Sequence, residues 1–80
     1  MPLAKKGHAE AQYVIGFIYY LGHETTINYE KAFKWYMKSA EQGNKGAQTS
    51  LGVMYYHGDG VTKSFSEALK WYKLSAAQGD

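Results

Sequence analysis

Three histidines and two nearby carboxylates are the side chains that could bind a metal ion. His23 lies next to Glu24, His57 lies two residues before Asp59, and His8 stands apart. Imidazole and carboxylate groups are common ligands of transition metals. A metal-binding helix usually presents two histidines four residues apart, so that both face the same side. No two histidines have this spacing, and the sequence therefore predicts no metal site.

Nucleophilic catalysis has as little support from the sequence. The chain has no cysteine, and none of its serines lies in a Ser-x-x-Lys or Gly-x-Ser-x-Gly motif. Ser39, Ser50 and Ser75 fall in helical patterns without a paired base. The glycine-rich stretch 58–60 is too short to cradle a phosphate. We therefore expect neither enzyme activity nor a cofactor.

Aromatic side chains offer a different chemistry, the recognition of a partner. The chain has two Trp, eight Tyr and three Phe. With about 100° between successive helical residues, Tyr13, Phe17 and Tyr20 gather on one face of a predicted helix, away from Ala11. Aromatic anchors dominate many protein interfaces. The alternative is that Tyr13 and Phe17 pack on neighbouring helices or on another copy of the chain.

An internal repeat determines the elements that would position these rings. A shift of 36 residues aligns the chain with itself without a gap, and 15 of the 36 pairs from Ala9/Lys45 to Asn44/Asp80 are identical. A fixed period of this length indicates stacked supersecondary units. Helical periodicity predicts two helices in each unit. The four helices run from about 8 to 20, from the cap at 28 to about 41, from the cap at 44 to a strong turn predicted at 58–60, and from the cap at 64 to about 77.

Several side chains have predicted roles within these helices. The expected apolar stripe of the first helix in each repeat is Ala11, Ile15, Ile18 and Tyr19, and then Ala47, Leu51, Met54 and Tyr55. Asn28, Asn44 and Ser64 are the predicted N-caps, and Glu67 completes a capping box with Ser64. Glycine is unfavourable inside a helix, so Gly16 and Gly52 indicate close helix–helix approach. Trp35 and Trp71 recur at the repeat period, which predicts packing in the core or between repeats.

The fold class that follows is all-α, a superhelical α/α solenoid of about two helix-turn-helix repeats. Residues 1–7 are interpreted as the tail of a preceding repeat helix, 8–43 as the first repeat and 44–80 as the second. Solenoids usually need three or more repeats to be stable. We therefore interpret the chain as part of a longer array or as a unit that self-association completes.

The repeats resemble those of the tetratricopeptide family. The matching segments are Ile15-Gly16-x-x-Tyr19, Ala32-x-x-x-Tyr36 and their counterparts 36 residues later. Tetratricopeptide repeats have a period of about 34 residues, and the longer period here places extra residues between the helices. The extra residues between the helices and the segment from Glu67 to Gly79 make the chain similar to the Sel-one-like repeat family.

The resemblance implies an α/α solenoid that acts as an adaptor for protein partners and has no chemistry of its own. In tetratricopeptide-like arrays, the first helix of each repeat lines a concave groove, so this face is the implied site for a peptide or a partner helix. The candidate binding residues are Glu10, Tyr13, Phe17, Tyr20, Thr49, Val53, Tyr56 and His57. The alternative is a structural or self-associating module that binds no ligand of its own.

Charge and composition exclude other classes of partner. The net charge is +2, and all nine basic residues are lysine. Proteins that read nucleic acids rely on arginine for bidentate contacts, so we expect no nucleic acid partner. No apolar run approaches a membrane span, and no signal peptide is expected. The lysines at 31, 34 and 38 predict a solvated outer face, and the lack of cysteine is consistent with a reducing compartment.

The predicted last helix would leave an aromatic face partly uncovered, around Ala68, Trp71, Tyr72 and Ser75. A large exposed apolar patch usually marks an interface, and 80 residues build only a small core. We therefore expect a homo-oligomer, most simply a two-fold dimer in which helices could be exchanged. The loop at 22–27, where Glu24 and Thr25 replace the glycine and valine of the second repeat, is the predicted hinge.

Overall fold

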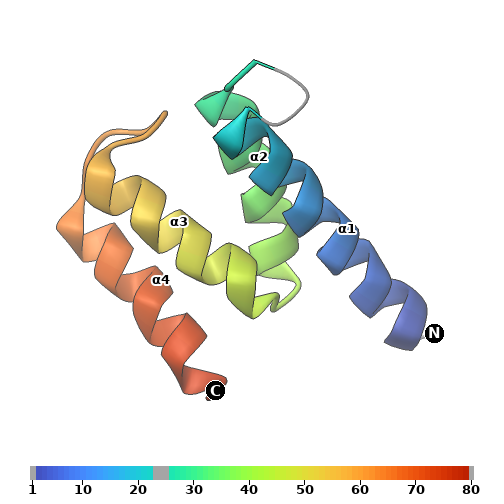
Figure 1. Ribbon diagram of the computed structural model, residues 1–80. Coiled ribbons are helices and arrows are strands. Elements are labelled where there is room, and N and C mark those ends of the chain that lie inside the picture. The colour runs from blue at the N-terminus through green and yellow to red at the C-terminus, as the bar shows by residue number, and fades with distance from the viewer. Residues whose placement is uncertain (1, 23–25, 80) are drawn as a thin grey trace.

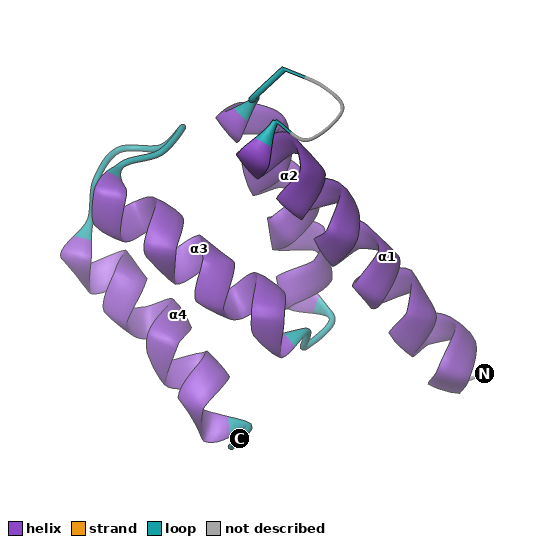
Figure 2. Cartoon of the chain, viewed as in Figure 1, coloured by secondary structure: helices purple, strands orange, loops and turns teal. Residues whose placement is uncertain are grey.

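The structure, a computed structural model, describes residues 2–22 and 26–79, and these ranges form four helices and no strand. The helices are α1 (Pro2–Leu21), α2 (Tyr29–Glu41), α3 (Lys45–His57) and α4 (Phe65–Ala77). Each helix packs back against the one before it, so that the four form a row from α1 to α4 (Figure 1). Short loops join α2 to α3 and α3 to α4 (Figure 2). The all-α solenoid predicted from the repeat is confirmed.

The predicted hinge falls partly on residues 23–25, which lie outside the described residues, as does Asp80. The glutamate and threonine that replace a glycine and a valine in the first loop belong to this segment. The hinge remains a prediction.

The core lies around α2 and α3, because each of these helices has a neighbour on both sides. Its buried cluster consists of Ala32, Tyr36, Ala40, Ala47, Leu51, Met54 and Trp71. The stripe predicted for the first helix of repeat two is confirmed, since Ala47, Leu51 and Met54 are each 0% exposed. The alternation of small and large side chains lets the helices approach closely while the aromatic rings fill the space between them.

The corresponding stripe of α1 is only partly buried. Ala11 is exposed, and Ile15 and Ile18 are half-buried, although their counterparts in α3 are fully buried. Within 8–21, the part of α1 whose burial the structure describes, the buried residues are instead Ala9, Gln12 and Gly16. The reason is that α1 packs chiefly against α2 on one side, whereas α3 lies between two helices. The prediction for Ala11 was therefore wrong in this chain.

The start of α1 also differs from the prediction. The helix begins at Pro2 rather than near His8, and it continues through Gly7 without a break. In the second repeat, the side chain of Asn44 caps α3 by accepting the Ala47 N–H at 2.8 Å. Position 8 is the counterpart of position 44, and histidine is not a preferred N-cap. Without a cap residue, no new helix starts there, and the residues predicted as a separate tail continue into α1.

The loop between α3 and α4 turns on two glycines with positive φ, Gly58 and Gly60, at 75° and 73°. A left-handed conformation is cheap only for glycine. Gly60 also packs against the start of α2, since a Cβ there would lie 2.7 Å from the Tyr29 Cβ. The strong turn predicted from the sequence is confirmed, and the structure adds that this turn contacts the first repeat.

The caps of α2 and α4 form as predicted. Asn28 Oδ1 accepts the Lys31 N–H at 3.0 Å, and Ser64 Oγ accepts the Glu67 N–H at 3.2 Å. The second half of the predicted capping box does not form, because the Ser64 N–H donates to the Tyr55 carbonyl at 2.9 Å. The first repeat has the same bond, from Asn28 N–H to the Tyr19 carbonyl at 2.9 Å. Each loop is thus tied to the end of the preceding helix.

Removal of a cap should lower stability measurably. We expect Ser64→Ala and Asn28→Ala each to reduce the free energy of unfolding by about 0.5–2 kcal/mol, because each leaves a helix N–H without its acceptor. Urea denaturation measures the change. Ser66→Ala, at an exposed position inside α4, is the matched control and should leave the midpoint unchanged or slightly raised. Equal midpoints for the wild type and both cap variants would contradict this account.

Candidate partner-binding groove

The first helices of the two repeats, α1 and α3, approach each other and enclose a hollow of about 160 Å³ between them. Its lining comes from three helices: Phe17, Tyr20, Tyr36, Thr49, Ser50 and Val53. We call this set the α1–α3 groove. The rim is open to solvent, since Phe17 is 46% exposed and Thr49 is exposed. Four of the eight candidate residues predicted from the sequence therefore line one hollow.

Tyr36 and Ser50 are the two lining residues that the sequence interpretation missed. Tyr36 is almost fully buried, and its ring lies over Gly16, where a Cβ would approach Tyr36 Cδ1 to 2.8 Å. Burial raises the pKa of Tyr36 to about 12, against a smaller lowering by the hydrogen bond with Ser50. No local pattern identified Ser50, because its repeat counterpart on α1 is the exposed, apolar Val14.

Tyr13 is a packing residue rather than a free wall of the groove. A Cβ at Gly46 would lie 2.9 Å from Tyr13 Cζ, so the ring rests directly on the backbone of α3. The ring also contacts those of Tyr36 and Phe17, with centroids 5.8 and 6.3 Å away. The glycine at position 46 thus lets the two repeats approach closely. The sequence left open whether Tyr13 and Phe17 pack on neighbouring helices. Tyr13 does so, whereas Phe17 faces the groove.

Tyr20 lines the groove and also joins the two repeats. Its hydroxyl donates to Asp59 Oδ2 at 2.9 Å, which ties α1 to the loop after α3. Its ring contacts Tyr29 and Tyr36, with centroids 5.3 and 6.3 Å away. Burial, then the hydrogen bond and negative charge of Asp59, raise the pKa of Tyr20 to about 12. The phenol is therefore held in its neutral form.

The raised pKa of Tyr20 predicts loss of stability in alkali. The ordinary tyrosine pKa is about 10, so between about pH 10 and the folded-state pKa of about 12 the unfolded chain releases a proton that the folded chain retains. The free energy of unfolding should be constant below this window and fall within it. Urea midpoints across the pH range measure the fall. Tyr20→Phe should make it shallower, and an equally steep fall in that variant would contradict the assignment.

The remaining candidate residues lie outside the α1–α3 groove. Tyr56 is 50% exposed, and its ring contacts His57 edge-on and Phe65, with centroids 5.2 and 5.4 Å away. With Phe65, Ala68, Leu69 and Tyr72, it lines a second hollow of about 290 Å³ between the end of α3 and α4. His57 is exposed at the last turn of α3, and Glu10 is exposed on α1 without lining either hollow. The structure therefore does not unite the eight candidates in one continuous site.

Charge is separated from the groove. The lining residues are all uncharged, and five exposed lysines lie instead on α2 and α4: Lys31, Lys34, Lys38, Lys70 and Lys73. Several of these amines lie over aromatic rings, as Lys38 does over Trp35 at 5.0 Å from the ring centroid. Such contacts let the stems of lysine cover apolar surface while the amine stays in water. The lysines therefore form the solvated outer face that the sequence predicts.

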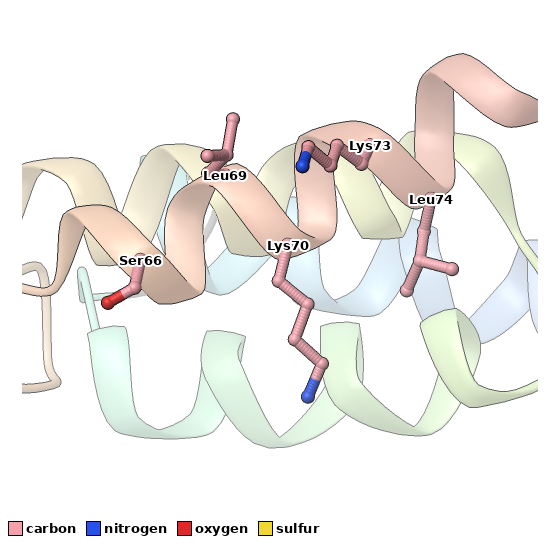
Figure 3. Close-up of a pocket in the computed structure, with 5 residues that line it drawn as sticks. All are labelled: Ser66, Leu69, Lys70, Lys73 and Leu74. Carbon is pink, nitrogen blue, oxygen red and sulfur yellow. The ribbon is translucent and has the colours of Figure 1, made fainter.

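A wider hollow of about 480 Å³ lies on the outer side of α4. Figure 3 shows its five residues, Ser66, Leu69, Lys70, Lys73 and Leu74, projecting from this one helix in different directions. A single helix cannot enclose a ligand from two sides. This hollow is a shallow surface between side chains, and the α1–α3 groove is the better candidate site because three helices wall it.

A metal centre and a membrane-spanning helix are two other kinds of site considered among the described residues. No three His, Cys, Asp or Glu side chains gather to hold a metal ion in the part of the chain that the structure describes. Within that same part, no helix is long and apolar enough to cross a membrane. The groove combines apolar walls with the hydroxyls of Thr49 and Ser50, a composition typical of recognition sites.

Comparisons with known proteins give a consistent result. A family model described as Sel1 repeat matches residues 9–44 and again 46–80. A crystal structure of a Sel1 repeat protein from Oxalobacter formigenes is 42% identical with a TM-score of 0.89, over 100% of this chain and 32% of that one. The structure of c5321, a protective antigen of uropathogenic Escherichia coli displaying an SLR fold, is also 42% identical with a TM-score of 0.89, over 96% of this chain and 16% of that one. No curated protein matched the sequence.

Proposed function

The chain belongs to the Sel1 repeat family, whose members are generally protein-interaction modules, and from this premise we propose that it binds a protein or peptide partner in the α1–α3 groove. The family is one of non-catalytic repeat scaffolds. The chain spans 32% and 16% of the two solved relatives, so partners of the whole proteins are not transferred to it.

The observation that carries the proposal is the hollow between the two repeats. Its volume of about 160 Å³ is below that of typical small-molecule pockets, which start at about 300 Å³. A cavity of about 150 Å³ accommodates a benzene ring. The groove therefore suits a single apolar side chain of a partner, inserted between Phe17 and Val53.

Polar groups at the rim add a means of orienting the partner. Thr49 is exposed, and its hydroxyl lies 2.7 Å from Ser75 Oγ, so it keeps further hydrogen-bonding capacity. A peptide that places its apolar side chain in the hollow brings its backbone N–H and C=O groups to this edge. The uncharged lining favours apolar anchors over acidic or basic ones, because burial of an unpaired charge is costly.

Selection from a peptide display library tests this function. The wild-type chain should select peptides with one recurring aliphatic or aromatic position. Phe17→Ala and Val53→Ala should weaken a selected peptide about tenfold or more, the effect of losing one anchoring contact of about 1.4 kcal/mol. Leu74→Ala removes a side chain of similar exposure, 43%, from the outer side of α4 and is the matched control. Unchanged affinity in both groove variants would overturn the proposal.

The second candidate function is a structural module that binds no separate ligand. The contact of Tyr13 with Gly46 and the bond from Tyr20 to Asp59 favour it, since both use the predicted binding face to hold the repeats together. The same library separates the two functions. A well-folded chain that selects no peptide above background would support the structural module.

A further inference from the structure

The walls of the α1–α3 groove carry hydroxyl groups as well as apolar surface. The lining residues that bear a hydroxyl are Tyr20, Tyr36, Thr49 and Ser50, whereas Phe17 and Val53 contribute only hydrocarbon. The four hydroxyls differ in the bonds that they already make inside the chain. Those bonds decide which side chain of a partner the groove accepts.

Two of the hydroxyls are tied to groups outside the hollow. The Tyr20 hydroxyl donates to Asp59 Oδ2 at 2.9 Å, and Thr49 Oγ1 lies 2.7 Å from Ser75 Oγ. Asp59 lies in the loop after α3 and Ser75 lies on α4, and neither of them lines the groove. The Tyr20 proton is therefore used, and the Thr49 hydroxyl is held toward α4 at the rim.

Tyr36 and Ser50 hold the other two hydroxyls, which come from α2 and α3. Burial raises the pKa of Tyr36 to about 12, and a hydrogen bond with Ser50 opposes this rise. A bond that favours the phenolate is one that the phenol oxygen accepts, so Ser50 is the donor. A hydroxyl group has one proton and two lone pairs. The pair itself therefore leaves the Tyr36 proton and the lone pairs of Ser50 Oγ for further bonds.

The depth and the walls of the hollow suit an aromatic ring. Tyr36 is 1% exposed and forms the floor, whereas Phe17 at the rim is 46% exposed. The volume of about 160 Å³ is close to that of a cavity that holds benzene, at about 150 Å³. Aromatic rings also interact favourably with the rings of Phe17 and Tyr20 on the walls. A ring that enters the hollow brings its far end to the hydroxyls at the floor.

We propose that the α1–α3 groove selects a tyrosine of the partner and that Tyr36 and Ser50 determine this specificity, an inference that rests on the proposed binding function. The partner's ring lies between Phe17 and Val53, and its hydroxyl reaches the floor. There the Tyr36 O–H donates to the incoming phenol oxygen, the incoming O–H donates to Ser50 Oγ, and the Ser50 O–H donates to Tyr36. Each of the three hydroxyls then donates one bond and accepts one.

The same floor disfavours an anchor without a hydroxyl. A phenylalanine or leucine side chain fills the hollow and excludes water from the Tyr36 O–H, but it offers no acceptor in return. A buried polar group without a partner is costly, and sites that bond a hydroxyl discriminate against analogues that lack it. Ser50 is only half-buried, so we expect a moderate preference for tyrosine of about tenfold.

Titration calorimetry with matched peptides tests the inference. A peptide selected on the wild-type chain is synthesised with tyrosine, phenylalanine or leucine at its recurring anchor position. The wild type should bind the tyrosine peptide about tenfold more tightly than the other two. In the double variant Ser50→Ala/Tyr36→Phe this preference should disappear, and the phenylalanine peptide should bind at least as tightly as it does to the wild type. Ser66→Ala, on the outside of α4, is the control and should keep the preference.

The outcomes separate this inference from the function on which it rests. If the wild type selects no peptide at all, both the binding function and the specificity are wrong. If peptides bind but phenylalanine or leucine serves as well as tyrosine, the specificity is wrong and the binding function stands. A preference for tyrosine that survives in the double variant would also overturn the inference, because other groups would then recognise the hydroxyl.

Discussion

Trp71→Ala is expected to reduce the free energy of unfolding by about 3–5 kcal/mol, the usual cost of removing a large aromatic side chain from a core. Trp71 is 8% exposed and belongs to the cluster that joins α2, α3 and α4. A chain of 80 residues has a total stability of roughly 4–12 kcal/mol at about 0.05–0.15 kcal/mol per residue. The variant should therefore lose much or all of its cooperative unfolding transition, measured by circular dichroism during heating.

Two matched variants show whether burial is the cause. Trp35 is the repeat counterpart of Trp71, but it is half-buried, so Trp35→Ala should cost clearly less. Among the described residues, the buried Trp71 Nε1 has no hydrogen-bond partner, and an unpaired buried donor is unfavourable. Trp71→Phe keeps a ring and removes this donor, so it should also cost less than alanine. Equal losses for Trp35→Ala and Trp71→Ala would contradict the assignment of Trp71 to the core.

Gly52→Leu is the second large effect that we expect, at about 1–3 kcal/mol or more. Gly52 is buried in α3, and a Cβ there would lie 2.5 Å from Tyr72 Cε1 and 2.6 Å from Tyr72 Cδ1. Any side chain at this position therefore forces α3 and α4 apart or displaces the tyrosine ring. Thermal unfolding measures the loss, and a melting temperature close to that of the wild type would rule out close contact at Gly52.

Two further variants isolate the clash with Tyr72. Lys34→Leu places the same side chain at an exposed position in the middle of α2 and should change stability little. Combining Gly52→Leu with Tyr72→Ala removes the ring that leucine would meet. The double variant should be more stable than the sum of the two single losses predicts, because the two sites are in contact. If the losses of the two single variants simply add in the double variant, the strain caused by Gly52→Leu does not come from contact with Tyr72.

The repeat pattern predicted those features that depend on local sequence. Asn28, Asn44 and Ser64 were identified as caps because a cap acts on a backbone N–H only three residues away. The glycine contact at Gly52 also followed from the pattern, because glycine inside a helix needs a compensating close approach. Local chemistry and periodicity were sufficient for these residues.

The features that were missed depend on which helices are neighbours. Ala11 and Ala47 are identical in the pattern, but only Ala47 is buried, because α3 lies between two helices. Glu67 does not complete its capping box because the Ser64 N–H already donates to Tyr55, nine residues earlier. Ser50 enters the groove through the approach of α1 to α3, which no local pattern encodes. A single repeat contains no information on these contacts.

The central claim is that a partner binds in the α1–α3 groove, and chemical-shift mapping tests it most directly. A peptide selected on the wild-type chain is added to the isotopically labelled protein, and the backbone and methyl signals are followed by NMR. The largest changes should occur at Phe17, Thr49, Ser50 and Val53, which line the hollow. The signals of Lys34 and Leu74, on α2 and α4, should move little. Larger changes at Lys34 and Leu74 than in the groove would contradict the claim.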